Sequence, residues 1–383
     1  PKNLFVQNVL LAGLYQLLFM DKVPAYAAIN TSVLLLKNKN LAKQAKYINA
    51  LLRKVQRETE LIEIHKQGEN FLPINKTKSW KFSDNIFPDL KENLYDYLGI
   101  VYSYPSFLTR KWCMQFGREK ATKLLQAGNI VPPLFLRPRV NYKKVEKQLK
   151  ESGVVFEHYN GLFWLKDKIG KINSLDSEDW VVTGPTSVEV IKALQPQQGM
   201  KILDMCAAPG GKTLHIIDTI RNKGEVLAID ISKDRLKLLK GRKEKLKLSC
   251  LKIEKYDASA LPVKFKNYFD QVLIDAPCSN SAVLTKRVEA RWRFNKKQLR
   301  QLQTLQKKLL YEGATTIKVG GSMLYSTCSI EPEENDKLVQ KFLKENPNFK
   351  CIEKKQILPF HPVLDGGTFF KIVKKLRPVH LDN

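Results

Sequence analysis

The sequence of 383 residues lacks the features of several classes of protein. Histidine is scarce, with five residues, and the six cysteines form no C-x-x-C pair, so the sequence indicates neither a zinc site nor a disulfide framework. We therefore expect no metal, and free thiols favour a reducing, cytoplasmic compartment. The longest apolar run, Val9 to Met20, is too short to cross a bilayer and lacks the flanks of a signal peptide. No membrane association is expected.

Acidic residues are also in the minority. There are 38 Asp and Glu against 65 Lys and Arg, which gives a formal net charge of +27 at pH 7. A charge of this size favours a polyanionic partner, and nucleic acid is the leading candidate. Charge alone leaves the alternative that lysines are simply spread over solvated faces. The remaining composition is that of an ordinary globular protein, which we expect to be a monomer.

The spacing of apolar residues divides the chain into three predicted domains. Helical periodicity predicts an all-helical module over residues 1–66, and because it is already under way at Leu4, we expect the native N-terminus to lie upstream. Residues 85–198 mix helical and strand patterns, which predicts an α+β module. In residues 199–376 apolar strands alternate with helices. This pattern predicts an α/β fold, a doubly wound and mostly parallel sheet whose ligand site lies at the carboxyl ends of the strands.

A glycine-rich turn, DMCAAPGGKT, begins at Asp204 and closes the first strand of this region. Its glycines allow a ligand to approach the backbone, and the helix that follows offers unpaired N–H groups. Asp230 ends the second strand, where a carboxylate can accept hydrogen bonds from a ribose diol. Asp257 follows the third strand and could receive an adenine amino group. Each aspartate alone also fits a turn or a helix cap, but together with the glycines they predict an adenosine-binding pocket.

Two cysteines follow neighbouring strands of the predicted sheet. Cys278 lies in the turn that begins at Asp275, and Cys328 lies in the turn after the next strand. The carboxyl ends of adjacent parallel strands meet at one edge, so we expect both thiols and Asp275 to converge beside the cofactor. An isolated cysteine is more often a small buried apolar residue. Two thiols in polar turns at adjacent strand ends indicate a reactive site instead.

Three ordered motifs, DMCAAPGGKT, DAPCS and YSTCSIEPEEN, together resemble the Nol/Nop/Sun family of RNA 5-methylcytosine methyltransferases. The resemblance extends from Gly199 to Leu376, and the first helices resemble the RNA-binding module NusB. It implies a Rossmann-like methyltransferase domain, S-adenosylmethionine as cofactor, and RNA contacts from the α+β module. The helical module favours 16S ribosomal RNA as the substrate. Transfer RNA, or a non-catalytic role as an RNA-binding or ribosome assembly factor, remains an alternative.

The resemblance also implies a role for each site residue. Carbon 5 of cytosine is too weak a nucleophile to attack a methylsulfonium directly, so Cys328 is expected to add to carbon 6 first. Asp275 would contact the ring nitrogen N3, and Cys278 would assist product release. The residues expected to bind the cofactor are Cys206, Ala207, Ala208, Pro209, Gly210, Gly211, Lys212, Asp230, Asp257 and Asp275.

Basic and aromatic side chains alternate in the segment after the Cys278 turn. Basic residues can hold phosphates while an aromatic ring stacks on an unpaired base. Alternatively, Trp292 and Phe294 pack the segment against the protein while its charges are solvated. The predicted RNA contacts are Arg287, Arg291, Trp292 and Arg293 in this segment, and Arg137 and Arg139 in the α+β module.

Overall fold

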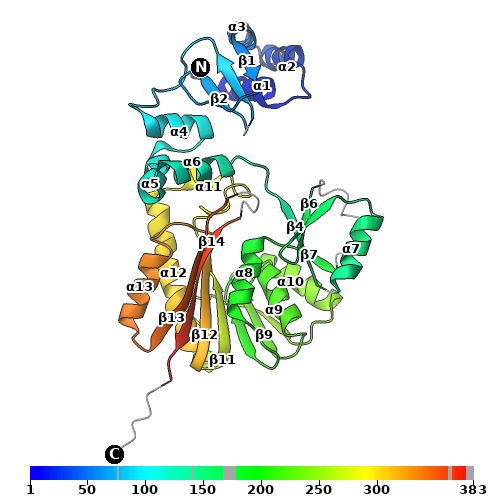
Figure 1. Cartoon of the computed structure of the whole chain (residues 1–383), viewed down its shortest axis with the longest axis vertical. Helices are drawn as coiled ribbons and strands as arrows, with labels where there is room; N and C mark the ends of the chain where they lie inside the picture. Colours follow the sequence, from blue (N-terminus) through cyan, green and yellow to red (C-terminus); the bar gives the residue numbers. More distant parts are fainter. Residues whose placement is uncertain (76, 140, 167–177, 361–364, 377–383) are drawn as a thin grey trace, which may run out of the picture. The chain divides into compact units, whose positions relative to one another are not determined.

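The computed structural model describes the chain except for residues 76, 140, 167–177, 361–364 and 377–383 (Figure 1). The chain divides into two compact units, Pro1–Arg118 and Glu119–Asn383. In the described part of the chain, no helix is both long and apolar enough to cross a membrane.

The first unit begins with three helices around a small apolar core. Their buried faces follow helical spacing and contribute Val6, Val9, Ile29, Leu36, Ala45, Ile48 and Leu52. A three-stranded antiparallel sheet in the order β1-β3-β2 follows, and two more helices complete the unit. The bounds are α1 Leu4–Phe19, α2 Ala25–Lys37, α3 Ala42–Glu58, β1 Thr59–Ile62, β2 Phe71–Pro73, β3 Ser79–Phe82, α4 Leu94–Tyr102 and α5 Ser106–Phe116.

The expectation that the first 66 residues are entirely helical is wrong at its end. Helix α3 stops at Glu58, because Thr59 adopts an extended backbone with φ −121° and ψ 139°. Residues Thr59–Ile62 then pair with Ser79–Phe82. The strand partner lies later in the sequence, between the predicted helical and α+β modules, so periodicity alone could not reveal the pairing.

The second unit opens with a small α+β layer. Its four-stranded antiparallel sheet has the order β5-β6-β4-β7. Helix α7 packs its apolar residues Val145 and Leu149 against Leu136, Phe163 and neighbouring side chains of this sheet. The bounds are α6 Arg118–Ala127, β4 Leu134–Pro138, α7 Tyr142–Glu151, β5 Phe156–Tyr159, β6 Leu162–Leu165 and β7 Trp180–Val182.

A seven-stranded sheet forms the rest of the second unit, in the order β10-β9-β8-β11-β12-β14-β13. The first five strands are parallel, β14 pairs antiparallel with β12, and β13 pairs antiparallel with β14 at the edge, so β14 alone of these seven strands runs in the opposite direction. The predicted α/β class and mostly parallel sheet are confirmed. The bounds are α8 Pro185–Leu194, β8 Lys201–Asp204, α9 Gly211–Thr219, β9 Glu225–Asp230, α10 Lys233–Lys245, β10 Leu251–Lys255, β11 Phe269–Asp275, α11 Ala290–Arg293, α12 Lys296–Thr316, β12 Ile317–Thr327, α13 Asp336–Glu345, β13 Phe349–Ile357 and β14 Gly367–Lys374.

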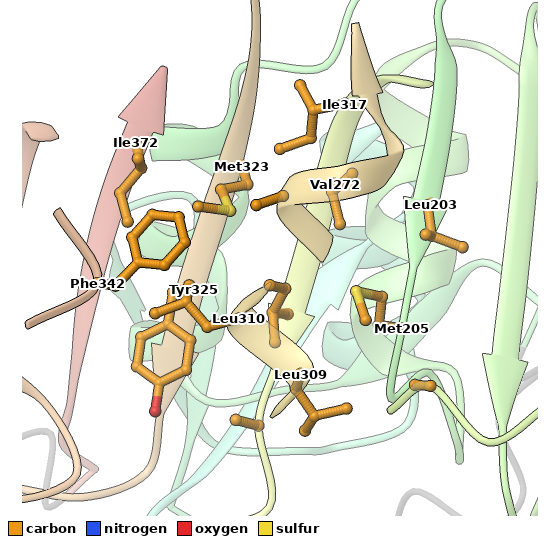
Figure 2. Packing of buried hydrophobic residues seen from close by; sticks show 14 of the residues in the cluster. Leu203, Met205, Val272, Leu309, Leu310, Ile317, Met323, Tyr325, Phe342 and Ile372 are labelled. Carbon is orange, nitrogen blue, oxygen red and sulfur yellow. The ribbon is translucent and has the colours of Figure 1, made fainter. Parts of the chain in front are cut away.

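Helices cover both faces of this sheet, and the alternation of side chains along each strand supplies both cores. Figure 2 shows Val272 of β11 in the cluster that includes Leu309 and Leu310 of α12. The next residue of β11, Leu273, belongs to the opposite cluster, which contains residues of α8, α9 and α10. Because helices pack against both faces of the strands, the sheet is rigid, and the positions of the turns at its carboxyl edge are fixed.

A buried ion pair joins the α+β layer to helix α9. The Asp218 carboxylate accepts hydrogen bonds from Arg137 Nη2 at 2.6 Å and from Arg139 Nη2 at 2.8 Å. The side chains of both arginines are less than a tenth exposed. The two guanidinium groups therefore serve a structural contact, and we do not carry Arg137 and Arg139 into the proposed RNA contacts.

We expect Asp218→Ala to lower the free energy of unfolding by about 3–5 kcal/mol, because it leaves two buried guanidinium groups without their carboxylate. Denaturant unfolding monitored by circular dichroism measures the loss. The control is Glu119→Ala, which removes the exposed pair with Lys123 and should change the stability far less, because solvent screens a surface ion pair. An equal, small loss in both variants would contradict a stabilising role for the buried pair.

Candidate active site

A pocket of about 230 Å³ opens at the carboxyl end of strand β8. One side is formed by the segment that leads into α8, and the other by the glycine turn and the start of α9. Its lining residues are Val182, Thr183, Gly184, Ser187, Asp204, Cys206, Ala207, Ala208, Pro209, Gly211, Lys212 and Asp275. The structure thus brings Asp275 and most of the predicted glycine-turn residues to one cavity.

The glycine turn has a conformation that requires glycine at one position. Gly210 has φ +101°, and a Cβ there would lie 2.4 Å from Leu239 Cδ1 of helix α10. Next to it, a Cβ on Gly211 would meet no atom within 4 Å. Helix α9 begins at Gly211, so its free N–H groups face the pocket side of the turn.

Asp204 lies at the floor of the pocket, and sequence reasoning did not assign it to the site. Its carboxyl group is buried, and Thr213 Oγ1 donates to Oδ2 at 2.7 Å. Oδ1 has no hydrogen-bond partner among the described residues. Burial is the largest cause that raises the pKa of Asp204 to about 7. Its position as the last residue of β8, before the glycines, is the signal that could have identified it.

Asp204→Asn tests how strongly the ionisation of this buried carboxyl group destabilises the fold. The folded protein holds the pKa of Asp204 at about 7, so ionisation destabilises the fold as pH rises from about 4, the unfolded value, to 7. The neutral amide avoids that cost and keeps an acceptor for Thr213. We expect the variant to raise the thermal midpoint by at least about 3 °C at pH 8 and to match the wild type near pH 4. A difference that is constant with pH would contradict this origin.

Asp230 ends strand β9, which pairs with β8, and Asp257 follows β10 on the far side of β9. Asp230 is buried, and its carboxylate accepts from the backbone N–H groups of Ala208 at 3.2 Å and Ser232 at 2.9 Å. These bonds leave further lone pairs on the carboxylate. Asp257 is exposed and accepts from both the N–H and the hydroxyl group of Ser259. Both aspartates lie at the predicted sheet edge, outside the residues that line the pocket.

Asp275 forms the ionic centre of the site. Lys212 Nζ lies 2.6 Å from its Oδ2, and Ser326 Oγ donates to its Oδ1 at 3.0 Å. Although burial works in the opposite direction, the Asp275 carboxylate raises the pKa of Lys212, which stays protonated. The lysine and the serine fix both carboxylate oxygens and orient Asp275 toward the pocket.

The structure brings Cys278 and Cys328 into direct contact. Both side chains are partly exposed, and their thiols form a hydrogen bond with each other. This contact lowers the pKa of Cys328 and raises the pKa of Cys278, so that Cys278 donates and Cys328 accepts. Burial and the Asp275 carboxylate act against this lowering, and the positive charge of Lys212 supports it. Of the two thiols, Cys328 is therefore the one that loses its proton more readily.

Glu334 and Asn335 complete the site, and sequence reasoning assigned no role to either. Both are fully buried between β12 and α13. Glu334 contacts the residue after each active-site cysteine, through hydrogen bonds with Ser279 and Ser329. The signal that could have identified them is the polar run EPEEN soon after Cys328. A charged residue this close to a strand end in the core has to be paired if the fold buries it, because charged residues are rarely buried without a partner.

The segment that follows the Cys278 turn presents only some of its predicted RNA contacts to solvent. Arg287 and Arg293 are exposed, and Trp292 is 61% exposed. Arg291 is buried instead, and its guanidinium donates to Asn129 Oδ1 at 2.7 Å and to the carbonyl of Gly128 at 2.8 Å. Arg291 thus ties the segment to the end of α6, and we leave it out of the proposed RNA contacts.

These features define the class of protein: a Rossmann-like methyltransferase fold with its pocket at the glycine turn. A methyltransferase homologue from Pyrococcus horikoshii has the same fold, with a TM-score of 0.65 and 23% identity over 73% of this chain and 98% of that chain. Among the described residues, no group of three or more His, Cys, Asp or Glu is placed to hold a metal ion.

The family follows from sequence comparison. The family model 16S rRNA methyltransferase RsmB/F matches residues 191–361, and the NusB family model matches residues 2–57. A relative from Synechocystis sp. (strain ATCC 27184 / PCC 6803 / Kazusa), named probable ribosomal RNA small subunit methyltransferase B, is 32% identical over 90% of this chain and 74% of its own length. Ribosomal RNA small subunit methyltransferase B of Proteus mirabilis (strain HI4320) is 30% identical over 98% of this chain and 83% of its own length. The chain belongs to the RsmB/F family of 16S rRNA methyltransferases, and the resemblance seen in its motifs is confirmed.

Proposed function

We propose that this protein transfers a methyl group from S-adenosylmethionine to carbon 5 of a cytosine in 16S ribosomal RNA, through a covalent bond between Cys328 and carbon 6. The observation that carries the proposal is the contact between Cys278 and Cys328, beside the Asp275–Lys212 ion pair. The two thiols provide a nucleophile and a proton donor at the edge of a pocket fit for a cofactor. Membership of the family supports the choice of ribosomal RNA.

The pocket suits S-adenosylmethionine by charge and by shape. Asp204 Oδ1 has no partner among the described residues and can accept a hydrogen bond from the ligand, and a cationic ligand would favour the ionised form of this carboxyl group. The open space beside Gly211 and the free N–H groups of α9 suit the part of the ligand that lies against the backbone. Asp230 retains acceptor sites for a ribose diol, and Asp257 lies at the neighbouring strand end for the adenine. When bound, the cofactor supplies an electrophilic methyl group.

Cys328 and Asp275 perform the first step of the proposed reaction. The Cys328 thiolate adds to carbon 6 of the cytosine, and the electron pair of the 5,6 double bond moves into the ring toward N3. Asp275, held by Lys212 and Ser326, must carry a proton in the reacting complex, so that its carboxyl group donates a hydrogen bond to N3 and offsets the negative charge that develops there. Carbon 5 is thereby made nucleophilic and takes the methyl group.

Cys278 acts after methyl transfer. A base removes the proton from carbon 5, the 5,6 double bond forms again, and the bond between Cys328 and carbon 6 breaks with its electron pair on sulfur. Cys278 is already hydrogen-bonded to that sulfur, so its thiol can stabilise the departing Cys328 thiolate. This contact supports the role in product release that the resemblance implies for Cys278.

The exposed basic segment supports RNA as the substrate. Arg287 and Arg293 are exposed beside Trp292, whose ring is available for stacking on an unpaired base. A cytosine within a helical stack must be unpaired or flipped out before Cys328 can reach carbon 6. We propose that this segment holds the RNA strand next to the flipped base, in the cytoplasm, where ribosomal RNA is the abundant polyanion.

We expect Cys328→Ala to abolish methyl transfer from labelled S-adenosylmethionine to RNA, because no thiolate remains to activate the ring. Cys278→Ala should instead accumulate a protein–RNA adduct that survives denaturing electrophoresis, because release of the Cys328 sulfur is impaired. Cys351→Ala, on strand β13 away from the pocket, is the matched control and should keep wild-type activity. The opposite result for the two active-site variants would reverse the assigned roles.

The substrate is tested by offering unmodified 16S ribosomal RNA and transfer RNA in parallel. We expect 5-methylcytosine to form in the ribosomal RNA, at least about tenfold faster than in transfer RNA, and bisulfite sequencing maps its position. Preference for transfer RNA would support the alternative substrate. Binding without transfer to either RNA would support a non-catalytic assembly factor.

A further inference from the structure

One buried carboxylate contacts the turns of both active-site cysteines. Glu334 Oε1 accepts from the backbone N–H of Ser279 and from Gln306 Nε2, both at 2.9 Å. Oε2 accepts from the hydroxyls of Ser279 and Ser329, both at 2.5 Å. Two of these donors, the N–H and the amide, can only donate, which suits an ionised acceptor. Four convergent hydrogen bonds stabilise the carboxylate in the interior.

The neighbouring Asn335 has a narrower set of contacts. It accepts from Thr327 Oγ1 at 2.7 Å and donates to the carbonyls of Ser329 at 3.0 Å and Glu331 at 2.9 Å. Thr327 and Ser329 flank Cys328, so Asn335 shapes the Cys328 turn alone. Glu334 differs because it spans both turns and brings a charge to the Cys278 side.

Neighbouring charged groups act differently on the pKa values of the two thiols. Beyond the thiol–thiol hydrogen bond and burial, the Glu334 carboxylate raises the pKa of Cys278. Beyond the hydrogen bond from Cys278, the Lys212 ammonium lowers the pKa of Cys328, against opposing effects of burial, Asp275 and Asp365. The titratable and charged groups that face the pair are Lys212, Asp275, Glu334 and Asp365, with Tyr325 and Cys206 close by.

We propose that Glu334 is a positioning residue that holds the two cysteine turns together and keeps the shared proton on Cys278, so that Cys328 is the thiolate. This proposal rests on the proposed function, in which Cys328 is the nucleophile. The two thiols share the same edge of the sheet and are chemically identical, so the difference between them has to come from surrounding groups. Glu334 is the charged group that bonds directly to the residue after Cys278.

The test measures which thiol reacts, without RNA or cofactor. Wild-type protein and variants are treated with substoichiometric iodoacetamide between pH 6 and 9, and mass spectrometry gives the ratio of Cys328 to Cys278 labelling. We expect the wild type to label first on Cys328. Glu334→Gln keeps the shape but removes the charge, so the ratio should fall about tenfold, the effect of one pKa unit.

Two further variants separate the effect of the Glu334 charge from the effect of the hydrogen bonds that hold the two turns together. Glu334→Asp keeps the charge on a shorter side chain, so its ratio should stay within about twofold of the wild type, even where the methylation rate falls. Asn335→Ala loosens the Cys328 turn with the Glu334 charge intact, so it should slow methylation while the labelling ratio and its pH dependence stay as in the wild type.

An unchanged labelling ratio in Glu334→Gln, or an equal fall in Asn335→Ala, would overturn the proposal and leave Glu334 as a structural brace. Near-ultraviolet circular dichroism checks that each variant is folded. If Glu334→Gln does not fold, Ser279→Ala takes its place. This variant removes the hydroxyl that holds the Glu334 carboxylate beside the Cys278 turn, so the charge acts on Cys278 from farther away and the ratio should fall; no change would count against the proposal. Absence of methyl transfer to any RNA would contradict the proposed function, whereas the labelling ratio is measured without RNA, so the two failures are distinguishable.

Discussion

The parallel pairing of β11 with β12 is the constraint on which the site depends. In this register Asp275 lies opposite Ser326, and each strand continues into a turn that carries a cysteine. Backbone pairing therefore determines that Cys278 and Cys328 meet, although fifty residues separate them along the chain. A shift by one residue would turn the side chains of one strand to the other face and separate the groups. The helices on both faces of the sheet hold that register.

Charges buried at the sheet edge give each group its chemistry. Lys212 neutralises Asp275 and favours the thiolate of Cys328, while Glu334 acts on the turn that contains Cys278. Asp204 adds a carboxyl group whose pKa burial raises to about 7, directly beneath the glycine turn. In the low-dielectric interior such charges act strongly over short distances. The pocket that we propose for a cationic cofactor and the pair of thiols thus arise in adjacent parts of one edge.

Much of this could be predicted from the sequence. Alternating apolar strands and helices indicated the parallel sheet, and motif positions at strand ends indicated the meeting of Cys278, Cys328 and Asp275. The strand β1 could not be predicted, because its partner strand comes later in the sequence and because the helical periodicity of α3 runs directly into β1. The burial of Arg137 and Arg291 was also hidden, because a basic residue on the surface and one paired in the interior look alike in sequence. The EPEEN run hinted at a buried acidic group, but the role of Glu334 was missed because only the fold places Ser279 and Ser329 around its carboxylate.

The central claim is that Cys328, and not Cys278, forms the bond to the cytosine. The most direct measurement uses 16S ribosomal RNA transcribed with 5-fluorocytidine, in which carbon 5 carries no proton to remove after methyl transfer. Incubation with wild-type protein and S-adenosylmethionine should trap the intermediate, and nuclease and protease digestion followed by mass spectrometry should find the nucleotide attached to Cys328. Attachment to Cys278, or methyl transfer without any trapped adduct, would contradict the account.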